Sequence, residues 1–232
     1  MLIGSGLLAT AFAQMVSHRE DVCIYAAGVS NSSCITPSEF GRETERLSDA
    51  LGMAWSADAF VYFGTCSALD PDAWNTPYVQ HKLKMEKLVA EHPKHLILRL
   101  PQVAGRTPNP HTLLNFLYAR ISRSESFQLW TKAKRNIIDV DDVAAVVSRI
   151  LADGSLRNIR LNIANPCNYP MCDIVNAMED VLGKRAIYDA VMRGSDYHID
   201  ISKMLCIQDS AGVRFGEDYL KRAIGKYYGK SR

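Results

Sequence analysis

The stretch that decides the fold is "MLIGSGLLATAFAQMVSHREDVCIYAAG", residues 1–28. A very short apolar segment, Met1 to Ile3, runs directly into a turn that contains two glycines. Small and apolar residues then follow, as in a helix that packs closely on a sheet. The segment "DVCIYAAG" (21–28) is typical of a buried strand that ends in small residues. The pattern therefore predicts a strand, a glycine turn, a helix and a second strand.

The turn itself, "GSGLLA" at 4–9, has the form of a dinucleotide fingerprint. Gly4 would make the tight turn, Gly6 would let the backbone approach a pyrophosphate at the helix N-terminus, and Ala9 would allow close packing of helix on strand. Glycine turns between a strand and a helix are also common in proteins that bind no phosphate. The motif alone leaves phosphate binding open.

Further along the chain, short apolar runs alternate with helical patterns. Strands are predicted at 59–65, 95–101 and 160–166. Helices are predicted after the Thr36 cap, at 77–91, at 110–123, from Asp141, up to Gly183 and in the basic tail after Phe215. This alternation favours a parallel sheet covered on both faces, whose ligands lie at the carboxyl ends of the strands.

Composition excludes several classes of protein. The 232 residues suffice for one well-cored domain with at most a small appendage, and the net charge of +2 does not favour nucleic acid or a membrane surface as a partner. No apolar run is long enough to span a membrane, and the N-terminus does not resemble a signal peptide. Six scattered cysteines without a C-x-x-C pair indicate free thiols in a reducing cytoplasm, and no metal site is expected.

The segment "TPYVQHKLKMEKLV" (76–89) places Tyr78 and Lys82 at i and i+4 on one helix face. An ammonium near a phenol would lower the pKa of the tyrosine and make it a usable acid or base. The simpler interpretation is a solvated helix face with an ordinary lysine, and His81 is interpreted as a surface residue. Position favours catalysis, because the helix follows a strand end that bears Thr65 and Ser67.

Taken together, seven pieces resemble an extended short-chain dehydrogenase/reductase of the NAD-dependent epimerase/dehydratase family, which modifies nucleotide sugars. The pieces, in order, are "GSGLLA", "YAAG", "YFGTCSALD", "YVQHK", "LRLPQVAG", "RNIIDVDDVA" and "YHIDISKM". The resemblance implies a Rossmann-like doubly wound sheet. It places a cofactor-binding core at 1–164, with a 106–138 insertion on the substrate side, and a smaller substrate-binding part at 165–232.

The resemblance also implies roles for individual residues. Thr65, with Ser67 as the fallback, would polarise the substrate oxygen, Tyr78 would be the acid/base, and Lys82 would hold the nicotinamide ribose. Residues implied to line an NAD or NADP cofactor are Gly4, Ser5, Gly6, Leu7, Leu8, Ala26, Ala27, Gly28, Lys82, Pro101 and Val103. Residues implied to meet the substrate are Ser67, Asn115 and Arg135, the last of which would suit bidentate phosphate recognition.

The chain departs from the family pattern between residues 17 and 22. Relatives follow the first helix with a strand that ends in an acidic residue for the adenosine ribose, then a helix and a third strand. Here only "SHRED" leads to "VCIYAAG", so we expect that strand–helix–strand piece to be missing. Affinity for NAD(P) would be weakened, and the usual determinant of NAD against NADP would be lost.

The leading hypothesis is an NAD(P)-dependent reductase or epimerase of a nucleotide sugar or a related polar keto substrate. Dehydration is less favoured, because Cys66 and Ser67 stand where dehydratases carry an acidic residue. The alternative is a non-redox or non-catalytic nucleotide-binding member of the same fold. Relatives dimerise through the tyrosine helix, but Lys84 and Lys87 make that face polar here. For Asp139, Asp141 and Asp142, capping of the following helix by Asp141 or Asp142 is preferred over a metal site.

Overall fold

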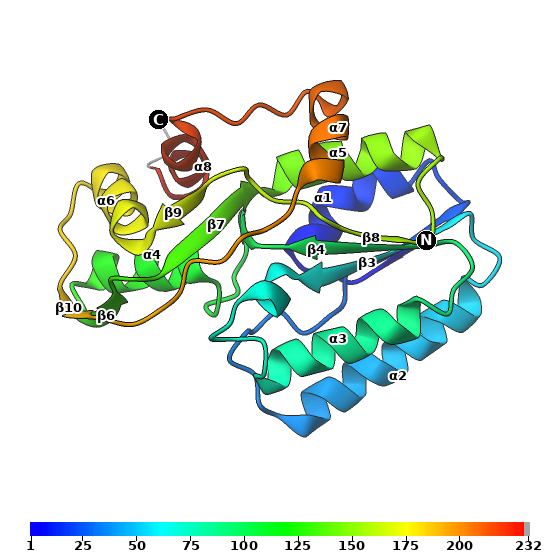
Figure 1. Ribbon diagram of the computed structural model, residues 1–232, viewed down its shortest axis with the longest axis horizontal. Coiled ribbons are helices and arrows are strands. Elements are labelled where there is room, and N and C mark those ends of the chain that lie inside the picture. The colour runs from blue at the N-terminus through cyan, green and yellow to red at the C-terminus, as the bar shows by residue number, and fades with distance from the viewer. Residues whose placement is uncertain (230–232) are drawn as a thin grey trace.

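Five parallel strands form the main sheet in the computed structural model, which describes residues 1–229 (Figure 1). Their order across the sheet is β1-β2-β3-β4-β8. The strands are β1 (Leu2–Ile3), β2 (Val22–Tyr25), β3 (Ala59–Thr65), β4 (His95–Leu100) and β8 (Ile159–Asn162). Every neighbouring pair is joined by a crossover that contains a helix, as parallel strands require. The predicted parallel sheet is confirmed.

Helices cover both faces of this sheet (Figure 1). On one face lie α1 (Leu7–Val16), α5 (Val140–Asp153) and α7 (Ser202–Gln208), and on the other lie α2 (Pro37–Met53) and α3 (Pro77–Val89). Ile24 packs into the first layer and Tyr25 into the second, because successive side chains of a strand point to opposite faces. Both faces are buried, which explains why the strand sequences are apolar throughout.

At one edge of the sheet, β1 has β2 as its neighbour among the described residues. Leu2 is in register with Ile24, and Ile3 with Tyr25. The chain passes from α1 to β2 through residues 17–21 without an intervening strand. The prediction that the second and third strands of the family are missing is therefore confirmed. Its consequence is that the glycine turn lies directly beside the "YAAG" strand end.

A second hydrophobic core lies beside the main sheet. It contains α4 (Leu113–Arg123), α6 (Met171–Leu182) and α8 (Tyr219–Tyr228), packed on short strands. Those strands form two small sheets: β5 (Gln102–Ala104), β7 (Lys134–Asp139) and β9 (Asn168–Pro170) in one, and β6 (Phe127–Trp130) with β10 (Tyr188–Val191) in the other. Helix α4, from the 106–138 insertion, packs here with the C-terminal helices. A domain boundary at residue 164 stays a prediction.

The cap of α5 differs from the one expected. Asp139, and not Asp141 or Asp142, is the N-cap, and its carboxylate accepts the Asp141 N–H at 2.9 Å. The other two aspartates lie in the first turn, where negative charge favours the helix dipole. Lys226 of α8 binds Asp139 and Asp141, each at 2.7 Å. The aspartate cluster therefore fastens the C-terminal helix to α5.

Two further expectations concern the state of the cysteines and the presence of a membrane-spanning helix. All six cysteines are free thiols, as predicted, and Cys23, Cys34 and Cys66 are buried. Within residues 1–229, no helix has the length and apolar character needed to cross a membrane.

Candidate active site

A cavity of about 1060 Å³ opens at the carboxyl ends of β1 to β4. Small-molecule sites typically enclose roughly 300–1,000 Å³, so this cavity has room for a large ligand. Its lining includes fourteen of the residues predicted for cofactor and catalysis, which are Gly4, Ser5, Gly6, Leu7, Leu8, Ala26, Ala27, Gly28, Thr65, Ser67, Tyr78, Lys82, Pro101 and Val103. The structure thus brings these residues together, while their roles stay predictions.

The glycine turn forms one wall of the cavity. Gly4 has a φ of +132°, and a Cβ at this position would overlap the backbone of Ala26, so another residue would not fit. Gly6 is the N-cap of α1 and leaves the first turn without a side-chain cap. Free N–H groups at a helix N-terminus attract anions. This wall can therefore bind a phosphate group.

Guanidinium groups add positive charge to the same cavity. Arg42 and Arg46 come from α2, and Arg106 comes from the loop after β5. Arg42 is paired with Glu39 on the same helix. Guanidinium groups match the planar, bidentate geometry of phosphate oxygens. The lining suits an anionic ligand better than a neutral one.

Tyr78 lies in the first turn of α3, which Thr76 caps by accepting the Val79 N–H at 3.4 Å. The tyrosine is only 8% exposed, yet it lines the cavity. Burial raises the pKa of the Tyr78 phenol well above its ordinary value, the nearby charge of Glu43 raises it further, and a hydrogen bond with Thr65 lowers it in part. At neutral pH the phenol therefore carries its proton.

Thr65 ends β3 beside the tyrosine. Its Oγ1 accepts the Ser67 N–H at 3.1 Å and so caps the short 3-10 helix Cys66–Leu69. Because the hydroxyl oxygen is engaged as an acceptor, its own proton remains to be donated. Thr65 can therefore hydrogen-bond either the phenol or a ligand oxygen in the cavity.

Lys82 is buried and is not paired with Tyr78. Its Nζ donates to Glu43 Oε1 at 3.1 Å and to the Tyr62 hydroxyl at 3.3 Å. The prediction that the lysine lowers the pKa of Tyr78 is therefore wrong in this structure. The carboxylate that neutralises Lys82 instead raises the pKa of that phenol.

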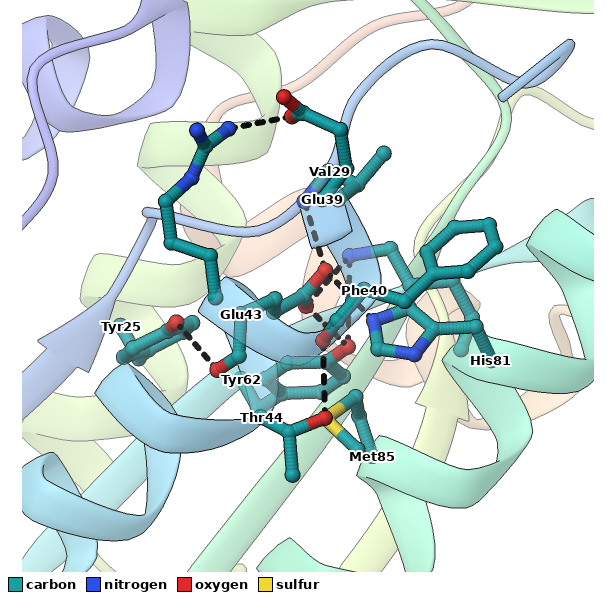
Figure 2. Close-up of polar contacts among 11 residues, drawn as sticks. Tyr25, Val29, Glu39, Phe40, Glu43, Thr44, Tyr62, His81 and Met85 are labelled. Carbon is teal, nitrogen blue, oxygen red and sulfur yellow. Dashed lines mark hydrogen bonds and ion pairs between the residues drawn. The ribbon is translucent and has the colours of Figure 1, made fainter. Parts of the chain in front are cut away.

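Glu43 is the centre of this polar cluster (Figure 2). Its Oε1 also accepts from the Tyr62 hydroxyl at 3.1 Å, and its Oε2 accepts the Val29 N–H at 2.7 Å. Burial opposes ionisation of the carboxyl, but the hydrogen bond from His81, the charge of Lys82 and the Val29 N–H together bring the pKa of Glu43 down to about 2. The carboxylate is ionised at every physiological pH.

His81 is buried, which corrects its interpretation as a surface residue. Its Nε2 lies 3.0 Å from Glu43 Oε2, and its ring stacks on Phe40 with centroids 4.5 Å apart. A carboxylate can only accept, so the contacting nitrogen carries a proton. Figure 2 shows the ring between Phe40 and the carboxylate. His81 therefore packs α3 against α2 and completes the cluster.

The remaining predicted substrate residues lie outside the large cavity. Arg135 lines a second, smaller cavity of about 140 Å³ and is 4.0 Å from Asp70 Oδ2. The Asn115 amide donates to the carbonyl groups of Thr107 and Asn109, at 2.8 and 2.7 Å. It also accepts from the Tyr228 hydroxyl at 2.6 Å. Its amide therefore fixes the 105–112 loop, and substrate contact by either residue stays a prediction.

Glu43 was missed as a site residue, although the sequence carried a signal. It lies between Phe40 and Leu47 on the face of α2 that packs on the sheet. A charged residue on the apolar face of a helix must find a buried partner. In the same way, His81 lies three residues after Tyr78 and four before Met85, on the buried face of α3. What the sequence could not show was that the two faces meet.

Comparisons with known proteins agree with this geometry. A search of curated proteins found no match. Solved structures similar to the chain include a UDP-galactose 4-epimerase, with a TM-score of 0.72, 16% identity, and coverage of 94% of this chain and 79% of that one. A dTDP-glucose 4,6-dehydratase from Bacillus anthracis in complex with NAD has a TM-score of 0.70, 15% identity and coverage of 94% and 76%.

A third structure is a UDP-glucuronic acid 4-epimerase from Bacillus cereus in complex with UDP-glucuronic acid and NAD. It has a TM-score of 0.71, 17% identity and coverage of 94% and 76%. At such identities the likeness shows the fold alone. The model of the NAD dependent epimerase/dehydratase family, however, matches residues 9–164, well over half of the chain. The chain therefore belongs to the NAD dependent epimerase/dehydratase family.

Proposed function

We propose that the protein is an NAD(P)-dependent reductase or epimerase of a nucleotide sugar, or of a related polar keto substrate. The observation that carries the proposal is the single cavity in which the glycine turn, Thr65, Tyr78 and Lys82 meet. Three similar structures support this class of ligand: one is a complex with NAD, one with NADPH, and one with both NAD and UDP-glucuronic acid.

The residues present fit most of a dinucleotide. The uncapped N-terminus of α1 suits the pyrophosphate, and Ala26, Ala27 and Gly28 leave space beside it. The acidic strand end that the family provides for the adenosine ribose is missing, and the cavity wall carries Arg46 and the Arg42–Glu39 ion pair of α2. An arginine there accommodates a ribose phosphate better than a bare diol. We therefore expect NADPH to bind at least as well as NADH.

A bound nicotinamide would supply or accept the hydride. The side chains of the cavity carry out the proton transfer. Tyr78, protonated at neutral pH, donates its phenolic proton to a substrate carbonyl oxygen as the carbonyl carbon is reduced to an alcohol. Thr65 donates a hydrogen bond to the same oxygen, and the phenolate regains a proton from solvent.

The test is substitution of Tyr78 in the full chain. We expect Tyr78→Phe to lower kcat by about 10² to 10⁴, the typical contribution of a positioned acid, while the dissociation constant for NADPH stays within about twofold. Reduction would be followed by NADPH absorbance with 4-keto nucleotide sugars, epimerisation by chromatography of the sugar products, and binding by NADPH fluorescence. Tyr188→Phe, in an exposed tyrosine of β10, is the matched control. Equal turnover of Tyr78→Phe and wild type would remove the phenol from the mechanism.

A second candidate is a non-catalytic nucleotide-binding protein of the same fold. The observation in its favour is that Glu43 neutralises Lys82, which leaves the lysine unpaired with Tyr78. Binding of a nucleotide sugar with neither oxidation of NADH or NADPH nor epimerisation of the bound sugar would support this candidate over the enzyme.

A further inference from the structure

The Glu43 cluster joins four separate segments of the chain. Val29 lies after β2, Glu43 lies in α2, Tyr62 lies in β3, and Lys82 lies in α3. Both carboxylate oxygens have two partners each, so the acceptor sites are filled. Figure 2 shows the carboxylate between the Val29 backbone and the His81 ring. The carboxylate is therefore fully satisfied as an acceptor.

Stability alone does not explain a carboxylate in this place. The Glu43 side chain is 1% exposed and that of Lys82 is 4% exposed. Replacing a buried ion pair by apolar residues of similar volume is often neutral or stabilising, because both charges lose their hydration. Glu43 and Lys82 both line the large cavity, however. The ion pair therefore lies at the wall of the ligand cavity.

The cluster fixes how Lys82 is presented to that ligand. Of its three ammonium protons, one goes to Glu43 and one to Tyr62, which leaves one for a ligand oxygen. The Nζ also lies against Gly28, where a Cβ would overlap it. The ammonium therefore has a set position and a single free donor.

The cluster also holds the wall of the cavity. Residues 28–36 line the cavity in an unbroken run and contain no helix or strand. At the start of this loop, Glu43 accepts the Val29 N–H, and one residue later Asn109 donates to the Ser30 hydroxyl at 3.0 Å. The carboxylate thus anchors the loop to the same point as the lysine.

We infer that Glu43 is a positioning residue of the nucleotide cavity, which holds the Lys82 ammonium and the Val29 end of the 28–36 loop where a dinucleotide meets them. The inference rests on the proposed function for the identity of the ligand. It assigns Glu43 no direct contact with the reacting atoms. Its effect on the ligand passes through Lys82 and through the loop.

The test compares Glu43→Gln with Glu86→Gln in the full chain. Glu86 is an equally buried carboxylate of α3, and it is paired with Arg99 outside the cavity lining. Two readouts apply to folded protein: hydrogen exchange of a peptide covering 28–36, and dissociation constants for NADH, NADPH and ADP-ribose. We expect Glu43→Gln to raise loop exchange at least about threefold and to weaken binding at least about tenfold, whereas Glu86→Gln changes each by less than about twofold.

Glu43→Asp keeps the charge on a shorter side chain, and we expect it to bind between wild type and Glu43→Gln. Where Glu43→Gln does not fold, Glu43→Asp takes its place in the comparison with Glu86→Gln. Unchanged loop exchange, or increased exchange with unchanged binding, overturns the inference. A different result would show that only the proposed function fails. In that case wild type binds ADP-ribose, and binding depends on Glu43, but wild type binds neither NADH nor NADPH. If wild type binds none of the three probes, both proposals fall.

Discussion

Glu43 and Glu86 are two buried carboxylates in the layer between the sheet and helices α2 and α3, and they are held by different chemistry. Arg99 grips Glu86 with two parallel bonds of 2.8 Å, and Arg160 adds a contact of 2.9 Å. Glu43 is held instead by a lysine, a histidine, a tyrosine and a backbone N–H. A guanidinium fork joins elements rigidly, whereas an ammonium keeps a proton for a ligand. We therefore interpret Glu86–Arg99 as a structural ion pair, and Glu43–Lys82 as an ion pair that positions the lysine for a ligand.

The largest expected effect comes from removing each carboxylate. Glu43→Ala removes the acceptor of His81 and leaves the buried Lys82 with only the Tyr62 hydroxyl, and we expect it to lower the free energy of unfolding by about 4 kcal/mol. Glu86→Ala should cost less, about 3 kcal/mol, because the Arg160 side chain is 48% exposed and can turn to water. Urea unfolding of the two variants measures both values. A larger loss of unfolding free energy for Glu86→Ala would show that the two arginines depend on their carboxylate more than Lys82 and His81 depend on Glu43.

The pH dependence of stability gives a second test of Glu43. Its pKa is about 2 in the folded protein against an ordinary 4.5, so below pH 4.5 the unfolded chain binds more protons than the native one. The stabilisation, about 3 kcal/mol, is therefore fully present above pH 4.5 and is lost as the pH falls toward 2. We expect the stability gap between wild type and Glu43→Gln to narrow from pH 6 to pH 3. A gap that stays constant over urea titrations in this range would contradict the assigned ionisation.

One glycine lies beside each carboxylate, and replacing either glycine should have a smaller effect on stability than removing the carboxylate. A Cβ at Gly28 would overlap Lys82 Nζ and lie 2.7 Å from Glu43 Oε1, and a Cβ at Gly64 would lie 2.5 Å from Glu86 Oε1. We expect each change to alanine to cost about 1 to 3 kcal/mol, the usual range for overpacking. Gly28→Ala should also weaken NADPH binding more than Gly64→Ala, because it displaces Lys82. Fluorescence titration of both variants checks the order, and equal losses would contradict it.

Much of the fold could be predicted from the sequence because its signals are local. Buried parallel strands are continuous apolar runs, so "AFVYFGT" predicted β3 with its bounds, Ala59–Thr65. The missing strands could be predicted because only five residues separate α1 from β2. Short strands such as β6 and β10 carry no such signal, since they pair over long sequence distances. The cap of α5 was misplaced because three nearby aspartates are equally suited to it.

The candidate site could be predicted only in part, for a related reason. Tyr78, Lys82 and the glycine turn stand at motif spacings, and the structure places all of them in one cavity. The partner of Lys82 could not be predicted, because Glu43 lies 39 residues earlier and reaches the lysine only when α2 packs against α3. That packing also reversed the expected effect on the pKa of Tyr78. The spacing of Tyr78 and Lys82 on one helix therefore does not determine the pKa of the tyrosine, because a carboxylate from a neighbouring helix also acts on it.

The smallest expected effect separates two tyrosines on neighbouring strands. The Tyr62 hydroxyl donates to Glu43 Oε1 and accepts from Lys82, whereas the Tyr25 hydroxyl donates only to the Glu43 backbone carbonyl, at 3.3 Å. Tyr62→Phe leaves both charged groups one partner short, and we expect it to cost about 1.5 kcal/mol. Tyr25→Phe removes one long bond to a helical carbonyl and should cost about 0.5 kcal/mol. Because the rings are stacked and equally buried, the difference measured by urea unfolding reports the hydroxyl contacts alone. Equal costs would mean that the Glu43–Lys82 pair does not depend on Tyr62, and that the Glu43 carboxylate suffices to hold the lysine.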